Sequence, residues 1–83
     1  MTDKEVAMQQ YAIRISKNLR LLMADERVIK NRELAKKSGV SEVTISSIKN
    51  DYKGNLRPGY KTLVSLANGL EVDITELLKE VSI

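Results

Sequence analysis

The hydrophobic pattern is clearest between residues 31 and 50, where it predicts two short helices separated by a turn. Ala35 is small enough to let the second helix come close, and Gly39 accepts the positive φ that a tight turn demands. Two helices that meet in this way leave one face of the second helix exposed, and such a helix fits the DNA major groove. The apolar residues expected to point inward and fix the crossing are Leu34, Val40, Ile45 and Ile48.

With three further helices, the same periodicity predicts five in all. The first runs from Thr2 or Asp3 to about Met23 or Ala24, with Thr2 and Glu5 forming a capping box. The remaining helices are expected at Asn31–Ser38, at Glu42–Asn50 with Ser41 as N-cap, from Gly59 or Tyr60 to Leu70, and after Asp73, which with Glu76 forms a second capping box.

The chain divides into a short N-terminal extension and one compact domain. Residues 1–10 form the extension, either helical or frayed, and residues 11–83 form the domain. Within the domain, Asp51–Pro58 is rich in Asn, Gly and Lys and is interpreted as an exposed loop. We therefore expect an all-α fold of five helices.

Composition narrows the chemistry available to the chain. Of the 83 residues 42% are hydrophobic and 4% aromatic, so Leu, Ile and Val must build the single core. There is no cysteine and no histidine, which removes disulfides, zinc–cysteine sites and the usual general base. No glycine-rich phosphate loop is present either. We therefore predict no enzyme, no catalytic residue, no metal site and no cofactor, and we place the protein in the cytoplasm because no signal core or membrane span is found.

The charge is mildly basic but unevenly distributed. The formal net charge is +3, with 14 Lys and Arg against 11 Asp and Glu. Acidic residues crowd toward the two ends, so a basic face could turn toward phosphates. A solvated helical surface explains the same charges equally well. The basic residues of the central region are Lys30, Arg32, Lys36, Lys37, Lys49, Lys53, Arg57 and Lys61.

Several ordered segments resemble the lambda-repressor-like helix-turn-helix family, also called the Cro/CI or Xre family. The resemblance covers about Ile15 to Leu78 and implies a compact five-helix DNA-binding domain. Its segments are Ile15, Leu19 and Leu22, then Glu33-Leu34-Ala35, Gly39-Val40-Ser41, Thr44-Ile45-Ser46 and Ile48, and finally Leu63, Leu66-Ala67, Leu70-x-Val72 and Glu76-Leu77-Leu78.

Two positions and the length of one loop depart from the family pattern. Asn31 stands where the family often has the longer Gln. Glu71 replaces the Gly that usually ends the fourth helix, which would cost on the order of 1 kcal/mol at a positive φ, unless the helix ends differently. The loop from Asn50 to Pro58 is about three residues longer than usual in the family.

The resemblance implies that the third helix reads bases through Glu42, Val43 and Ser47. Glu42 can accept a hydrogen bond from cytosine N4, and Val43 can pack on a thymine methyl group. Ser47 can reach a base edge or a phosphate. The competing interpretation is that Glu42 only interacts favourably with the helix dipole in the first turn, and that Val43 is an exposed apolar residue without a binding role. Because no Arg or Gln stands at a reading position, we expect modest specificity per half-site.

A second set of residues is expected on the DNA backbone, where contacts position the protein without reading sequence. Four members of this set have a second interpretation. Ser41 also serves as an N-cap, and Thr44 is equally suited to stabilising the helix. Lys53 and Arg57 are equally well explained as solvated surface side chains. Tyr52 and Tyr60 either donate to phosphates or cover the core edge. The expected backbone contacts are Asn31, Arg32, Ser41, Thr44, Asn50, Lys53 and Arg57.

The leading hypothesis is a nucleoid-associated regulator of transcription, a repressor or Cro-like protein that binds double-stranded DNA. A homodimer is expected to place its recognition helices about 34 Å apart. Its predicted surface is the C-terminal helix, with Leu78, Val81 and Ile83, and the rival surface is the first helix, with Met8, Tyr11 and Met23. The alternative is a protein-interaction module, or the antitoxin of a toxin–antitoxin pair, with a small protein as partner.

Overall fold

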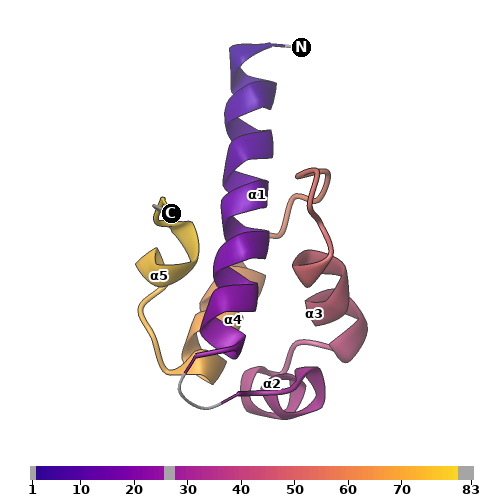
Figure 1. The fold of residues 1–83 in the computed structure, drawn as a ribbon, viewed down its shortest axis with the longest axis vertical. Coiled ribbons are helices and arrows are strands. Elements are labelled where there is room, and N and C mark those ends of the chain that lie inside the picture. The colour runs from indigo at the N-terminus through magenta and orange to yellow at the C-terminus, as the bar shows by residue number, and fades with distance from the viewer. Residues whose placement is uncertain (1, 26–27, 81–83) are drawn as a thin grey trace.

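The computed structural model describes residues 2–25 and 28–80, which form five helices (Figure 1). The described residues contain no strand, and the fold is all-α as expected. A long first helix stands upright, and four shorter helices surround its C-terminal half. The helices are α1 (Asp3–Met23), α2 (Asn31–Ser38), α3 (Glu42–Lys49), α4 (Tyr60–Leu70) and α5 (Thr75–Leu78).

The core is aliphatic, as the composition predicts, and α1 contributes three residues that the other helices enclose. Leu19 of α1, Leu34 of α2 and Leu66 of α4 are completely buried. Such side chains each stabilise the fold by roughly 1.5–3 kcal/mol relative to an exposed position. The buried cluster consists of Ile15, Leu19, Met23, Leu34, Ile45, Ile48, Leu63, Leu66, Ala67 and Leu77.

Most predicted helix boundaries are confirmed. The N–H of Glu5 donates to Thr2 Oγ1 at 3.1 Å, so Thr2 is the N-cap of α1. Gly39 adopts φ 76° in the turn after α2, in the left-handed conformation that its position demands. The third helix is slightly shorter than predicted, because it ends at Lys49 and Asn50 is its C-cap.

The prediction of a capping box at the fifth helix is wrong. This helix begins at Thr75, and Ile74 occupies the N-cap position. Asp73 Oδ1 instead accepts the N–H and the hydroxyl of Thr75, both at 2.9 Å, while Glu76 forms an ion pair with Lys79. The two hydrogen bonds from Thr75, the backbone one first, lower the pKa of Asp73 below its ordinary value of 3.8.

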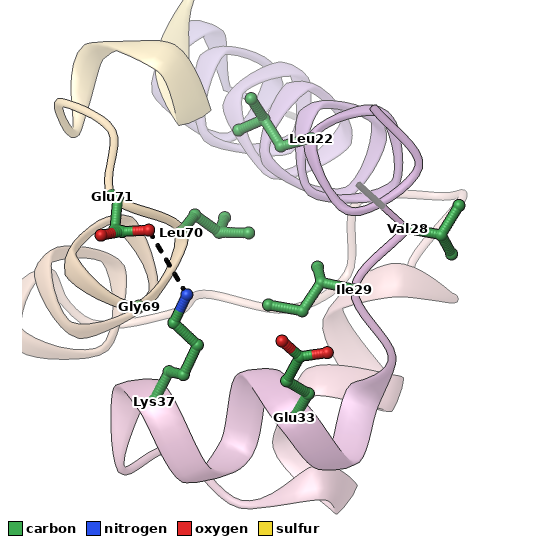
Figure 2. Close-up of a pocket in the computed structure, with 8 residues that line it drawn as sticks. All are labelled: Leu22, Val28, Ile29, Glu33, Lys37, Gly69, Leu70 and Glu71. Carbon is green, nitrogen blue, oxygen red and sulfur yellow. Dashed lines mark hydrogen bonds and ion pairs between the residues drawn. The ribbon is translucent and has the colours of Figure 1, made fainter. Parts of the chain in front are cut away.

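Helix α4 ends without glycine, and Glu71 adopts the left-handed conformation at φ 60°. The N–H groups of Glu71 and Val72 donate to the carbonyls of Asn68 and Ala67, which is the Schellman pattern. Figure 2 shows Lys37 reaching from α2 to Glu71, with an Nζ–Oε2 distance of 3.4 Å. The helix therefore ends in the geometry typical of glycine although the residue is Glu.

Two glycines permit close approach between segments. Gly69 is buried where α4 meets α2, and a Cβ there would lie 2.8 Å from Ser38 Cβ. Gly54, at φ 72°, is buried against α1, where a Cβ would overlap the Gln9 carbonyl. The amide of Gln9 also donates to the Lys53 carbonyl at 2.9 Å. The loop predicted as exposed thus docks on α1 through Gly54.

Candidate nucleic-acid interface

Helix α3 is held to the body by one side and is open on the other. Ile45 and Ile48 face the core and are buried, as the hydrophobic pattern predicts. Val43 is 76% exposed, and Glu42 and Ser47 are also exposed. The three residues expected to read bases therefore lie on the solvent side of α3.

The N-terminal end of α3 is capped by Ser41. Its Oγ accepts the Thr44 N–H at 3.1 Å and also donates to Thr44 Oγ1 at 2.9 Å. Both residues are exposed. The N-cap role of Ser41 is confirmed, and Thr44 keeps its own hydroxyl hydrogen for a further acceptor because its oxygen is the acceptor in this pair.

The C-terminal end of α3 is pinned to α1 by hydrogen bonds to one carbonyl. The Lys49 carbonyl accepts Ser16 Oγ at 3.1 Å and Arg20 Nη1 at 2.8 Å. The Arg20 guanidinium also lies 4.3 Å from the centre of the Tyr52 ring. Because the last carbonyls of a helix lack intrahelical partners, these donors fix the direction in which α3 points.

Lysine 49 also connects α3 to the start of α2. Its Nζ donates to Asn31 Oδ1 at 2.8 Å, and both residues are half-buried. Because the oxygen of the Asn31 amide is occupied, the NH₂ group is the half that remains available to a phosphate. The shorter Asn in place of the family's Gln is thus held by a lysine from α3.

Arg57 is the expected cationic backbone residue that the structure brings beside the base-reading face. Its Nη1 donates to the carbonyls of Gly54 and Leu56, both at 2.7 Å, so loop carbonyls hold the guanidinium. It lies with Pro58 along a groove of about 260 Å³ beside α3. The residues lining this groove are Val43, Thr44, Ser47, Ile48, Leu56, Arg57, Pro58 and Thr62.

The other expected backbone residues are scattered. Asn50 is exposed at the end of α3, with its amide 3.4 Å from Ser46 Oγ. Lys53 is exposed on the part of the loop that faces α1. Arg32 lies with Lys30 and Lys36 along a separate surface of α2. Of the cationic residues expected on the backbone, the structure brings Arg57 beside the α3 face and leaves Arg32 and Lys53 apart.

The tyrosines differ in their surroundings. Tyr52 stacks beneath Arg20, and Tyr60, at the first position of α4, is 79% exposed. The sequence interpretation missed Ser16, Arg20 and Lys49 as residues that orient α3. For Ser16 a signal existed, because a polar residue lies within the apolar stripe of a helix only where it finds a partner.

A long helix followed by a helix-turn-helix with an exposed second helix defines a DNA-binding domain of the helix-turn-helix class. Residues 18–81 match the sequence profile described as a Cro/C1-type HTH DNA-binding domain. The chain belongs to this family. No curated protein and no solved structure matches the chain. Within the described residues, no helix combines the length and apolar content needed to cross a bilayer.

Proposed function

We propose that this protein is a sequence-specific regulator of transcription, a repressor or Cro-like protein, that inserts α3 into the major groove. The observation that carries the proposal is an exposed α3 whose inner side is buried and whose two ends are held by hydrogen bonds. A helix with a fixed direction presents its side chains to base edges with little loss of conformational freedom on binding.

Base reading is assigned to Glu42, Val43 and Ser47, all exposed on the outer face of α3. A carboxylate, an isopropyl group and a hydroxyl match cytosine N4, a thymine methyl group and a polar base edge respectively. Each of these three side chains makes a weaker contact than the bidentate contact of an Arg or Gln, so specificity requires two half-sites. The backbone contacts are assigned to Asn31, Arg32, Ser41, Thr44, Asn50, Lys53 and Arg57.

The regulator is proposed to act as a homodimer in the cytoplasm, on the nucleoid. The C-terminal helix is the surface that the sequence predicts for the dimer. Leu78 is half-buried there and packs against the core cluster, whereas Val81 and Ile83 lie outside the described residues. Met23, one of the residues of the rival surface, is buried in the core and is therefore excluded from it.

A gel-shift titration on the DNA flanking the protein's own gene tests the proposal. The backbone set contains three cationic residues, Arg32, Lys53 and Arg57, so a dimer would make about six charged phosphate contacts. The logarithm of the association constant should then fall with the logarithm of salt concentration with a slope of about −5. Absent binding, or binding that salt does not weaken, would contradict the proposal.

The alternative of a protein-interaction module is favoured by one observation. The groove beside α3 has apolar walls, with Val43, Leu56 and Pro58 among its residues, and would accept an apolar side chain of a small protein partner. Substituting Glu42→Gln and Ser47→Ala separates the two functions. A DNA reader changes its site preference, while a protein-binding module retains its partner and shows no site to change.

A further inference from the structure

The N-terminal half of α1 extends past the four shorter helices (Figure 1). A helix of 21 residues is about 31 Å long, which is most of the 37 Å length of the molecule. Residues 2–8 are all exposed, and they precede the part of the chain that matches the family. This projecting segment therefore lies outside the residues that match the family.

Apolar surface runs in a helical stripe from the end of the projecting segment, at Met8, along α1. Met8 and Tyr11 are 39% and 50% exposed, and they continue the line of Ala12 and Ile15, which the core covers. Together with Arg57 and Pro58 these four residues line an apolar groove of about 220 Å³. A helix that leaves such a stripe in water gains stability when a second apolar surface covers it.

The charges around this groove are complementary to those of the projecting tip. The first turn of α1 contains Asp3 and Glu5 and is net acidic with Lys4. The groove itself contains Arg57; Arg14 lies over the Tyr11 ring at 5.1 Å, but its Nη2 is 4.0 Å from Glu80 Oε2 and its charge is partly balanced there. An acidic helix tip and a basic groove edge on the same chain match a second copy of that chain.

We infer that two copies associate through α1, with the tip of each helix in the groove of the other. In an antiparallel pairing centred between Met8 and Gln9, Glu5 of one copy lies opposite Ala12 of the other, where Arg57 lines the groove. The two-fold axis repeats this contact, and Met8 lies near the axis. A symmetric pairing of this kind buries both apolar stripes and forms two ion pairs.

The pairing is compatible with DNA binding. Arg57 and Pro58 line both the α1 groove and the groove beside α3, so the two-fold axis would pass close to the Asp51–Pro58 loop. The α1 groove contains no residue of α3, and only Arg57 and Pro58 are common to the two grooves. The inference rests on the proposed homodimer, but it locates the contact on α1 rather than on the C-terminal helix.

Sedimentation of the full chain without DNA, across the micromolar range, tests the location. Met8→Glu places a charge in the groove and should raise the dimer dissociation constant at least about tenfold. Leu21→Glu is the matched control, because Leu21 is 51% exposed on the same helix but lies in a groove beside α5. Dissociation by Leu21→Glu and not by Met8→Glu would place the interface on the C-terminal side and overturn the inference.

Charge reversal and cross-linking sharpen the test. Glu5→Arg and Arg57→Glu should each weaken the dimer, and the double variant should restore it, whereas a double variant no better than either single one would contradict the pairing. Because the chain has no cysteine, Met8→Cys should give a disulfide-linked dimer under mild oxidation, and Leu21→Cys should not.

Gel shifts on single and paired half-sites, with the same variants, keep this inference separate from the proposed function. If the parent protein dimerises through Met8 but binds no DNA, the regulator proposal fails and the α1 interface stands. If the parent protein binds DNA and Met8→Glu leaves its assembly unchanged, or if the parent is monomeric throughout, the α1 interface is refuted.

Discussion

Replacing Glu71 with glycine should stabilise the protein, because Glu71 holds a backbone conformation that suits glycine. Its φ of 60° and ψ of 39° lie in the left-handed region, where an ordinary side chain costs about 1–2 kcal/mol. Glycine removes this cost. The backbone hydrogen bonds that end α4 are retained, since they use the N–H groups of Glu71 and Val72.

Two losses oppose the gain. Glycine is more flexible in the unfolded chain, which lowers the free energy of unfolding by about 0.5–1 kcal/mol. The ion pair between Lys37 and Glu71 is also removed, but its Nζ–Oε2 distance is 3.4 Å and the carboxylate side chain is 78% exposed, so it contributes only about 0.3 kcal/mol after solvent screening. The net expectation is a stabilisation of about 0.5 kcal/mol, or a rise in Tm of about 3 °C.

Urea denaturation followed by circular dichroism measures the difference, provided that the m-value is unchanged. Glu71→Gln is the control, because it retains the strained backbone and removes the charge. It should lose no more than about 0.5 kcal/mol. Both variants lack the ion pair, so a Glu71→Gly protein less stable than Glu71→Gln would show that the flexibility of glycine in the unfolded chain outweighs the relief of backbone strain, and would refute the reasoning.

Four further outcomes are expected. Gly69→Ala should destabilise the fold by about 1–3 kcal/mol in thermal unfolding, because its methyl group would push α4 from α2, whereas Gly59→Ala, with open space around it, should not. Asn18→Leu should cost about 1–3 kcal/mol in urea denaturation, because the buried Asn18 amide donates to the Leu77 and Lys79 carbonyls, and an unchanged midpoint would contradict this role. Arg20→Met should weaken DNA binding about fivefold in a gel shift while far-UV dichroism stays the same, because the last carbonyl of α3 loses a donor; unaltered affinity would count against the orienting role. Because the pKa of Asp73 is lowered in the folded state, its contribution to the free energy of unfolding is complete above pH 3.8 and is lost as the pH falls through the folded pKa. In an acid titration, Asp73→Asn should therefore lose less stability than the parent over that pH range. Equal losses would contradict the hydrogen bonds from Thr75 to Asp73.

Local features of the fold were accessible to sequence reasoning because neighbouring residues decide them. The glycine turn at Gly39, the N-caps at Thr2 and Ser41, and the burial of Ile45 and Ile48 depend on spacings of a few residues, and all are confirmed. The family resemblance also predicted an all-α fold, which the residue 18–81 match confirms. The capping box at Asp73 failed because a four-residue helix follows it, and Thr75 takes the carboxylate instead.

What the tertiary structure alone decided are contacts between residues far apart in the chain. Asn18 holds α5, Ser16 and Arg20 hold the end of α3, and Lys49 orients Asn31, across separations of 18 to 61 residues. Periodicity indicates which face of a helix is apolar, but it does not show which carbonyl a polar side chain on that face will reach. By itself the sequence determined the helices and the exposed side of α3, while the direction in which α3 points was decided by hydrogen bonds that exist only once α1 has packed against it.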